Sequence, residues 1–178
     1  IDTDQIIPAR FMTRPRSAGY GDVLLHDLRH DPEGRPAPGF EGLAGAMFLV
    51  AGANFGCGSS REAAVYALAD AGIRAVLAPG FADIFRTNAL KNGLLPITLP
   101  PEGHARAARA PRLEVDLEAC EVRLEDGGPA LGFSLPAVAR RRILQGLDEI
   151  ADTLTRRRQI EAHEAAVRAA RPWALPTT

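Results

Sequence analysis

The most regular pattern of apolar and polar positions lies between residues 46 and 99. Short apolar runs alternate there with stretches in which apolar residues recur at helical spacing. The apolar runs span residues 46–51, 73–78 and 94–99. Gly72 and Gly93 end the two intervening helical stretches, a common position for glycine. The pattern predicts a β-α-β-α-β unit with parallel strands and right-handed crossovers.

The regions before and after this unit have different sequence patterns. Residues 9–22 mix arginines with proline and glycine, which predicts an irregular, mobile loop. Beyond Pro100-Pro101 we expect a short helix, then two or three antiparallel strands between residues 113 and 135. From about residue 137 the chain is predicted to be helical, over 137–145 and 148–168, with Gly146 as the break. The prediction is a single α/β domain over 1–178 with a β-hairpin region and a helical C-terminal extension.

Composition excludes several classes of protein. The chain has 178 residues, 46% of them hydrophobic and 24% charged, which is ordinary for a globular domain. A formal charge of −1 gives no general attraction to nucleic acid or to anionic membranes. We find no apolar run long enough for a membrane helix and no leader pattern, so we expect a cytoplasmic protein. Cys57 and Cys120 are too few for a disulfide framework or a four-cysteine metal site, and no metal site is predicted.

A glycine-rich turn follows the first predicted strand. It contains Gly52, Gly56 and Gly58 and leads into the next helix. Glycines let the backbone adopt positive φ and approach a ligand closely, and a helix N-terminus presents unpaired N–H groups. The carboxyl edge of a parallel sheet is also where α/β folds usually bind ligands. These features predict an anion-binding loop.

Ser59 and Glu62 have the spacing of a helix capping box, with Ser59 at the N-cap. Arg61 would then lie in the first helical turn, where a cation is unfavourable to the helix dipole. Its guanidinium is suited to a carboxylate or phosphate. The alternative is that Ser59 only caps the helix, Arg61 lies in solvent and the glycines form a tight turn. The loop is neither a Walker loop nor a complete dinucleotide fingerprint.

Three motifs resemble a known family. They are IDTDQIIP at 1–8, NFGCGSSRE at 54–62 and GFADIFRTNALKNGLLP at 80–96. In this order and spacing they resemble the small subunits of 3-isopropylmalate dehydratase, which are similar to the swivelling domain of aconitase. The resemblance continues through residues 116–119 and 146–148 and covers nearly the whole chain. It implies an aconitase-like swivelling β/β/α domain.

The resemblance also implies a two-chain hydro-lyase of leucine biosynthesis. A separate large subunit would hold a 4Fe-4S cluster, with no cofactor in this chain, in a heterodimer or heterotetramer. The reaction would be the reversible dehydration and rehydration that converts 2-isopropylmalate to 3-isopropylmalate. Alternatives are a related hydro-lyase for methylmalate/citraconate or homocitrate, or a non-catalytic anion-binding module. The chain begins at Ile1 inside a motif, and we expect a few residues to precede it.

Residue roles follow from the same resemblance. The family's base is the first serine of the S-S-R-E motif, here Ser59, while Ser60 and Arg61 contact substrate carboxylates. Asp4 matches an active-site aspartate. A carboxylate-binding arginine is expected about a dozen residues further on, which indicates Arg16 with Arg14 as a rival. Gly56 and Gly58 form the anion-binding loop.

Other candidates have simpler interpretations. Cys57 is expected to be a packing residue and Cys120 a strand residue, and the four histidines lack metal-ligand spacing. The arginine triplets at 140–142 and 156–158 are interpreted as a solvated face. Asn88 is expected to shape the wall of the site without a chemical role.

Overall fold

Three parallel strands form the centre of the fold in a computed structural model that describes residues 1–174. They are β1 (Phe48–Val50), β2 (Ala75–Ala78) and β3 (Leu95–Thr98), in the order β1-β2-β3. The connecting helices are α3 (Glu62–Asp70) and α4 (Asp83–Lys91). The predicted β-α-β-α-β order is confirmed. Each strand is shorter than its apolar run, although flanking residues such as Ala51 and Leu99 still donate backbone hydrogen bonds to β2.

Both faces of this sheet are covered, which explains its nearly continuous apolar sequence. Val76 and Ala78 of β2 face one core together with residues of α3 and α4. The alternate residues Ala75 and Leu77 face a second core. The strand period of two therefore divides β2 between two cores.

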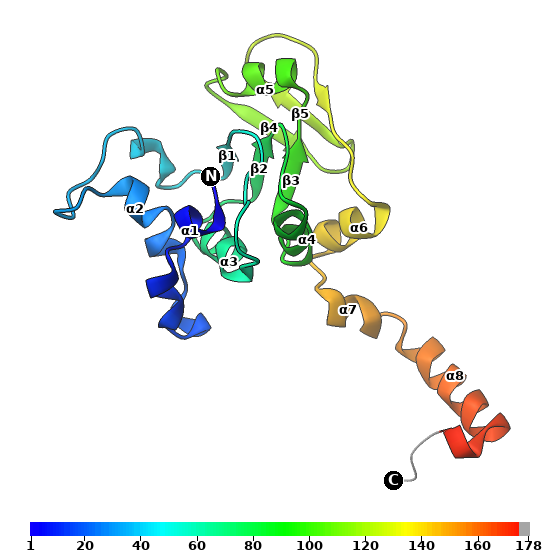
Figure 1. Cartoon of the computed structure of the whole chain (residues 1–178). Coiled ribbons are helices and arrows are strands. Elements are labelled where there is room, and N and C mark those ends of the chain that lie inside the picture. The colour runs from blue at the N-terminus through cyan, green and yellow to red at the C-terminus, as the bar shows by residue number, and fades with distance from the viewer. Residues whose placement is uncertain (175–178) are drawn as a thin grey trace.

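The second core lies between the parallel sheet and an antiparallel sheet. The latter contains β4 (Leu113–Asp116), β5 (Glu121–Leu124) and β6 (Leu131–Gly132) in that order. Helix α5 (Pro101–Ala107) precedes it. The arrangement of antiparallel sheet, parallel sheet and helices confirms the predicted β/β/α layers (Figure 1).

The N-terminal region consists of short helical turns. These are α1 (Thr3–Ile6), the 3-10 helices η1 (Ala9–Thr13), η2 (Arg16–Ala18) and η3 (Gly21–Val23), then α2 (His26–Arg29) and η4 (Glu41–Leu43). The prediction that residues 9–22 are irregular is therefore wrong, because successive i→i+3 bonds organise them, such as Ala18 N–H to the Pro15 carbonyl at 3.0 Å.

Gly21 joins this region to α3 at close range. A Cβ on Gly21 would lie 2.6 Å from the backbone carbon of Asp70, the last residue of α3. No larger residue fits there without moving the backbone. The loop that contains residues 9–22 is therefore fixed at its C-terminal end.

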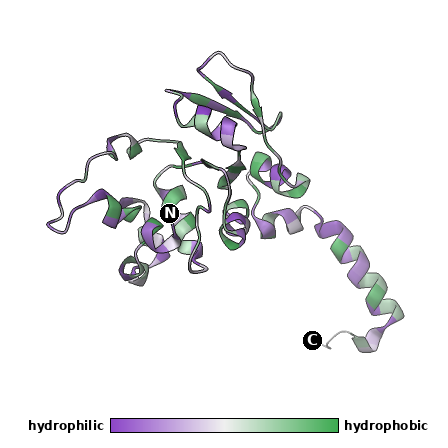
Figure 2. Cartoon of the chain, turned by 45° about the horizontal axis from the view of Figure 1, so that its top comes forward, coloured by the Kyte–Doolittle hydropathy of each residue, from purple (hydrophilic) through white to green (hydrophobic). Residues whose placement is uncertain are grey.

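The C-terminal region is helical, with one difference from the prediction. Helix α6 (Ala137–Gln145) has the predicted bounds and ends at Gly146, whose φ is 63°. The predicted helix over 148–168 is two helices, α7 (Glu149–Leu154) and α8 (Arg157–Ala170), because the backbone at Arg156 leaves the helical region. A 3-10 turn, η5 (Pro172–Ala174), follows. Helix α8 extends away from the body, with apolar and polar residues on different faces (Figures 1 and 2). The last four residues of the predicted domain lie outside the described part.

The interpretation of residues 140–142 as a solvated face is wrong for two of the three arginines. Arg141 and Arg142 bind opposite oxygens of the buried Asp152 carboxylate, at 2.5 and 2.8 Å. The positions of the acidic residues in the sequence did not indicate that Asp152 of α7 would bind the arginines of α6. Across residues 1–174, no helix combines the length and apolar character needed to cross a membrane.

Candidate active site

The glycine-rich loop begins where β1 ends and lies beside the connection between β2 and α4. Phe55, buried in the loop, donates its N–H to the Gly80 carbonyl at 3.1 Å and accepts from the Ala82 N–H at 3.0 Å. Its ring packs edge-on against Phe81 and Phe85. The loop and the start of α4 are therefore held together at the carboxyl edge of the parallel sheet.

The first residues of the chain hold the other side of the loop. The Gly56 N–H donates to the Ile1 carbonyl at 2.9 Å, and the Thr3 N–H donates to the Cys57 carbonyl at 2.8 Å. The Thr3 hydroxyl donates to the Ser59 carbonyl at 2.8 Å. Two predicted motifs, at 1–8 and 54–62, are thus brought into direct contact.

Two glycines give the loop its path. Gly56 has φ +76°, and a Cβ there would lie 2.2 Å from the Phe85 ring. Gly58 has φ +91°, next to Asp2 and Thr3. The prediction of positive φ is confirmed for Gly56 and Gly58 but is wrong for Gly52. At Gly56 the close approach of an aromatic ring is an additional reason for glycine.

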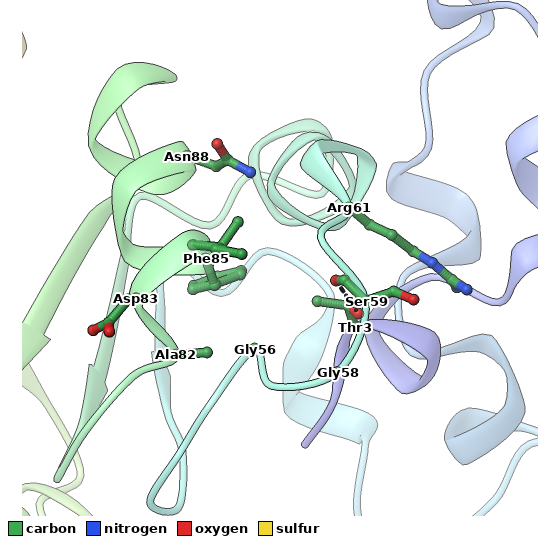
Figure 3. A pocket seen from close by; sticks show the side chains of 10 residues that line it. Thr3, Gly56, Gly58, Ser59, Arg61, Ala82, Asp83, Phe85 and Asn88 are labelled. Atoms are coloured by element: carbon green, nitrogen blue, oxygen red, sulfur yellow. Dashed lines mark hydrogen bonds between the residues drawn. The ribbon is translucent and has the colours of Figure 1, made fainter.

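A cavity of about 280 Å³ opens between this loop and α4 (Figure 3). Its wall combines loop residues with the first turns of α4 and one residue of α1. The residues are Thr3, Gly56, Gly58, Ser59, Arg61, Ala82, Asp83, Ile84, Phe85 and Asn88. Of the predicted site residues, Ser59, Arg61, Gly56 and Gly58 line the cavity. Ser60 is adjacent in sequence and exposed but is not part of the wall.

Two helix N-termini meet at this cavity. Helix α3 begins directly after Arg61, and helix α4 begins at Asp83 in the cavity wall. Each helix has nine residues, and its first N–H groups carry partial positive charge. One acidic residue in the first turn of each helix, Glu62 in α3 and Asp83 in α4, partly offsets this charge, while Arg61 at the N-cap of α3 adds a positive charge beside the loop. The potential at the loop therefore favours an anion.

The predicted capping box is wrong. Arg61, rather than Ser59, is the N-cap of α3, and no side chain caps this helix. Glu62 instead accepts a hydrogen bond from the Asn92 amide at 2.8 Å. A capping box does exist at α1, where Asp2 and Gln5 bond reciprocally to each other's backbone N–H at 2.7 and 2.9 Å. Ser59 is therefore free of a capping role, and within residues 1–174 its hydroxyl has no protein hydrogen-bond partner.

Arg61 is held by Asp4. One guanidinium nitrogen, Nη1, donates to the Asp4 carboxylate. The Arg61 side chain is 18% exposed and that of Asp4 is 53% exposed. Figure 3 shows Arg61 extending away from Phe85 and Asn88. Since only Nη1 bonds to Asp4, the Nη2 and Nε donors remain for a second carboxylate.

The two other predicted arginines bind elsewhere. Arg16 forms a two-point ion pair with Asp70, at 2.8 and 3.1 Å, and its guanidinium stacks 4.3 Å from the Tyr66 ring centre. Arg14 binds Asp22 at 2.9 Å. Neither contributes to the cavity wall in this structure.

Five wall residues were not predicted. They are Thr3 of α1 and four residues at the start of α4, namely Ala82, Asp83, Ile84 and Phe85. Asn88, expected to shape the wall, does line the cavity. The sequence contained no local signal for Thr3, because its partner, Ser59, is 56 residues away.

The two thiols do not form a common site. Cys57 lies in the glycine-rich loop and Cys120 precedes β5, and both are free. Within residues 1–174 no three side chains of His, Cys, Asp or Glu are arranged to hold a metal ion.

Comparison with known proteins places this geometry in a class. A model of the aconitase C-terminal domain family matches residues 41–102, which contain the loop, α3 and α4. The fold and the loop thus define an aconitase-type domain. Proteins named 3-isopropylmalate dehydratase small subunit are similar over almost the whole chain. The chain is 47% identical to that of Anaeromyxobacter dehalogenans, covering 94% of this chain and 91% of the relative, and 45% identical to that of Dinoroseobacter shibae, covering 97% and 90%.

A solved structure agrees with this assignment. The 3-isopropylmalate dehydratase LeuD from Methanocaldococcus jannaschii superposes with a TM-score of 0.61 at 28% identity, over 92% of this chain and 91% of the other. The chain belongs to the family of 3-isopropylmalate dehydratase small subunits.

Proposed function

We propose that this chain is the small subunit of a 3-isopropylmalate dehydratase, a hydro-lyase that interconverts 2-isopropylmalate and 3-isopropylmalate in leucine biosynthesis. The observation that carries the proposal is the meeting of Ser59, Arg61 and two helix N-termini at one cavity. The named relatives, similar over more than nine-tenths of the chain, support it. A cytoplasmic location stays a prediction.

Ser59 is proposed as the base that takes a proton, at Oγ, from the carbon beside a substrate carboxylate. A serine hydroxyl is a poor base at neutral pH and needs positive potential around it. The N-terminus of α3 and the Arg61 guanidinium supply positive charge on the same loop. Because Ser59 is exposed and has no cap to form, its hydroxyl is available for this role.

Arg61 is proposed to bind a substrate carboxylate through the donors that Asp4 leaves unused. A carboxylate does not bind another carboxylate directly, so Asp4 orients Arg61 rather than touching the substrate's charged groups. Ser60 would add a hydrogen bond from its exposed hydroxyl. The carboxylate-binding role predicted for Arg16 stays a prediction, and it requires the ion pair with Asp70 to open.

The partner is proposed to be a large subunit that completes the site, and the 4Fe-4S cluster is assigned to that subunit. Ser59, in the cavity wall, and the adjacent Ser60 are both exposed to solvent. Proton abstraction beside a carboxylate benefits from exclusion of water, which here requires a second chain. The cysteines of this chain lie on separate elements and do not fit a cluster. When bound, such a cluster supplies a Lewis acid for the departing hydroxyl.

Reconstitution with the cognate large subunit tests the proposal. The absorbance of the unsaturated intermediate is followed with isopropylmalate, methylmalate, citraconate and homocitrate. We expect turnover with isopropylmalate. Activity only with another of these acids would support a related hydro-lyase. No activity with any of them would contradict the enzyme function and support a non-catalytic anion-binding module.

The Ser59→Ala variant tests the proposed base. We expect turnover to fall by about 10³-fold or more, since loss of a positioned acid–base group typically costs 10²–10⁴-fold. Assembly with the large subunit, measured by size exclusion, should be unchanged. Ser134→Ala, which removes an exposed hydroxyl elsewhere, is the matched control. Near-normal turnover of Ser59→Ala would assign the proton transfer to another residue.

A further inference from the structure

Thr3 is an unusual residue for its position. Its relative exposure is 1%, and among residues 1–174 the only other buried polar or charged residue is Asp152. A buried hydroxyl is costly unless it makes a hydrogen bond. Thr3 makes that bond to the Ser59 carbonyl, at 2.8 Å, rather than to its own helix.

The Ser59 peptide depends on this contact. Gly56 and Gly58 both have positive φ, and glycine gives the loop no side chain with which to fix its path. Helix α3 begins only at Glu62, so Ser59 is outside its hydrogen-bond ladder. Within the described residues, the Thr3 hydroxyl is the one side chain that bonds to the backbone of Ser59.

Thr3 itself is firmly placed. Its own N–H bonds to the Cys57 carbonyl at 2.8 Å, and Asp2 forms a parallel bridge with Cys57. The capping box of Asp2 and Gln5 fixes α1, and Ile6 is fully buried in the core. The hydroxyl that binds the Ser59 carbonyl therefore belongs to a residue that is itself fixed in position.

Asp4, the next residue of α1, also holds a residue of the loop. Asp4 binds the Arg61 guanidinium, so adjacent residues of α1 hold the two groups proposed for chemistry. Figure 3 shows Thr3 beside Ser59, with the dashed bond between them, and Arg61 on the same side of the loop. The spacing between Ser59 and Arg61 is thus determined by α1 as well as by the loop.

We propose that Thr3 is a positioning residue for Ser59. Its hydroxyl fixes the Ser59 carbonyl and thereby the direction in which the Ser59 side chain leaves the loop. This inference deepens the proposed function and rests on the assignment of Ser59 as the base. Thr3 lines the cavity wall, but its hydroxyl hydrogen is taken by the Ser59 carbonyl.

The test compares Thr3→Val, which keeps the shape and removes the hydroxyl, with Thr3→Ser, which keeps the hydroxyl. In the reconstituted enzyme we expect Thr3→Val to lower kcat by about 10- to 100-fold with KM little changed, because small misplacements of a catalytic group have effects of this size. Thr3→Ser should recover most of the lost kcat. Thr153→Val is the control, since the Thr153 hydroxyl also bonds to a backbone carbonyl, that of Glu149 at 2.8 Å, far from the cavity.

A second measurement is independent of activity. Amide hydrogen exchange of the full chain should show faster exchange over residues 56–61 in Thr3→Val, and wild-type exchange there in Thr3→Ser. Equal losses of kcat in both Thr3 variants would indicate a packing role and overturn the proposal, as would full activity of Thr3→Val. If the wild-type enzyme is inactive with every acid, the proposed function fails, while the exchange measurement still decides whether Thr3 tethers the loop.

Discussion

Two clusters of opposite charges in this chain differ in burial and in bonding. Near the cavity, Asp4 is half-exposed and receives one donor from Arg61. At the start of the C-terminal region, Asp152 is 7% exposed and receives one guanidinium on each oxygen, from Arg141 and Arg142. Because the Asp4 carboxylate is half-exposed and takes one donor, Arg61 can bind a second carboxylate without losing this ion pair. A buried pair cannot be opened without leaving an uncompensated charge.

The two clusters therefore suit different tasks. The hydrogen bond from Arg142 lowers the pKa of Asp152, burial opposes this effect, and the hydrogen bond from Arg141 adds to the lowering. Asp152 is therefore ionised at neutral pH, where it joins α6 to α7. Arg61 is oriented by Asp4 but keeps donors for a ligand. The comparison indicates that charge pairing near the cavity serves binding, whereas pairing at α7 serves stability.

Three substitutions test this comparison. The largest effect is expected for Arg61→Lys, and it is an effect on activity. Lysine keeps the charge but loses the fork that serves Asp4 and a substrate carboxylate together. We expect kcat/KM to fall by about 100-fold, equivalent to the roughly 1.5–3 kcal/mol of a hydrogen bond to a charged group. The thermal midpoint should not change. Arg123→Lys, in an exposed ion-pair group on β5, is the control. Full activity of Arg61→Lys would contradict the binding role.

The second largest effect is expected for Asp152→Asn, and it is an effect on stability. Removing the buried charge leaves Arg141 without its partner and Arg142 with only the exposed Glu149, and we expect the thermal midpoint at pH 7 to fall by about 10 °C. Since the pKa of Asp152 is lowered in the folded state, the stabilisation is present above the ordinary value of 3.8. It is lost as the pH falls through the lower, folded-state pKa.

Thermal melts from pH 7 to pH 3 measure this dependence. The difference between wild type and Asp152→Asn should be constant near neutral pH and shrink below pH 3.8. Glu149→Gln, at an exposed carboxylate 3.4 Å from Arg142, should change the midpoint little at any pH. A difference that does not vary with pH would show that packing, rather than charge, joins α7 to α6.

The smallest effect is expected for Asp4→Asn. Asparagine still accepts a hydrogen bond from Arg61 but removes the competing negative charge. We expect KM to change by only a few-fold, because the Asp4 carboxylate is half-exposed and solvent screens its interaction with Arg61. The change in KM should weaken as salt is raised. A loss of kcat as large as that of Ser59→Ala would instead give Asp4 a direct part in proton transfer.

The predictable part of the fold is the part determined by local pattern. The strands and α4 follow from apolar runs and from glycine stops such as Gly72 and Gly93, because burial on both faces leaves few alternatives. The glycine-rich loop was located by the same reasoning. The family motifs then added the identities of Ser59 and Arg61.

The remainder depends on contacts between distant residues. The S-x-x-E spacing predicted a cap, but Glu62 bonds to Asn92 and the Ser59 carbonyl bonds to Thr3. Arg16 is bound by an aspartate 54 residues away, which no local pattern indicates. Where such tertiary partners compete with a local motif, the local motif is a weak guide.

The close approach of Gly21 to the end of α3 has a consequence for how this family can diversify. The segment over residues 9–20 is attached at a fixed point, where Gly21 meets the Asp70 backbone and the Tyr20 N–H bonds to the Asp70 carboxylate at 2.9 Å. Phe11, Met12 and Tyr20 of this segment also pack against the core, so a replacement segment has to keep these apolar contacts as well as the glycine and the aspartate. Changes in the length of this segment are therefore constrained both at Gly21 and at its apolar contacts with the core.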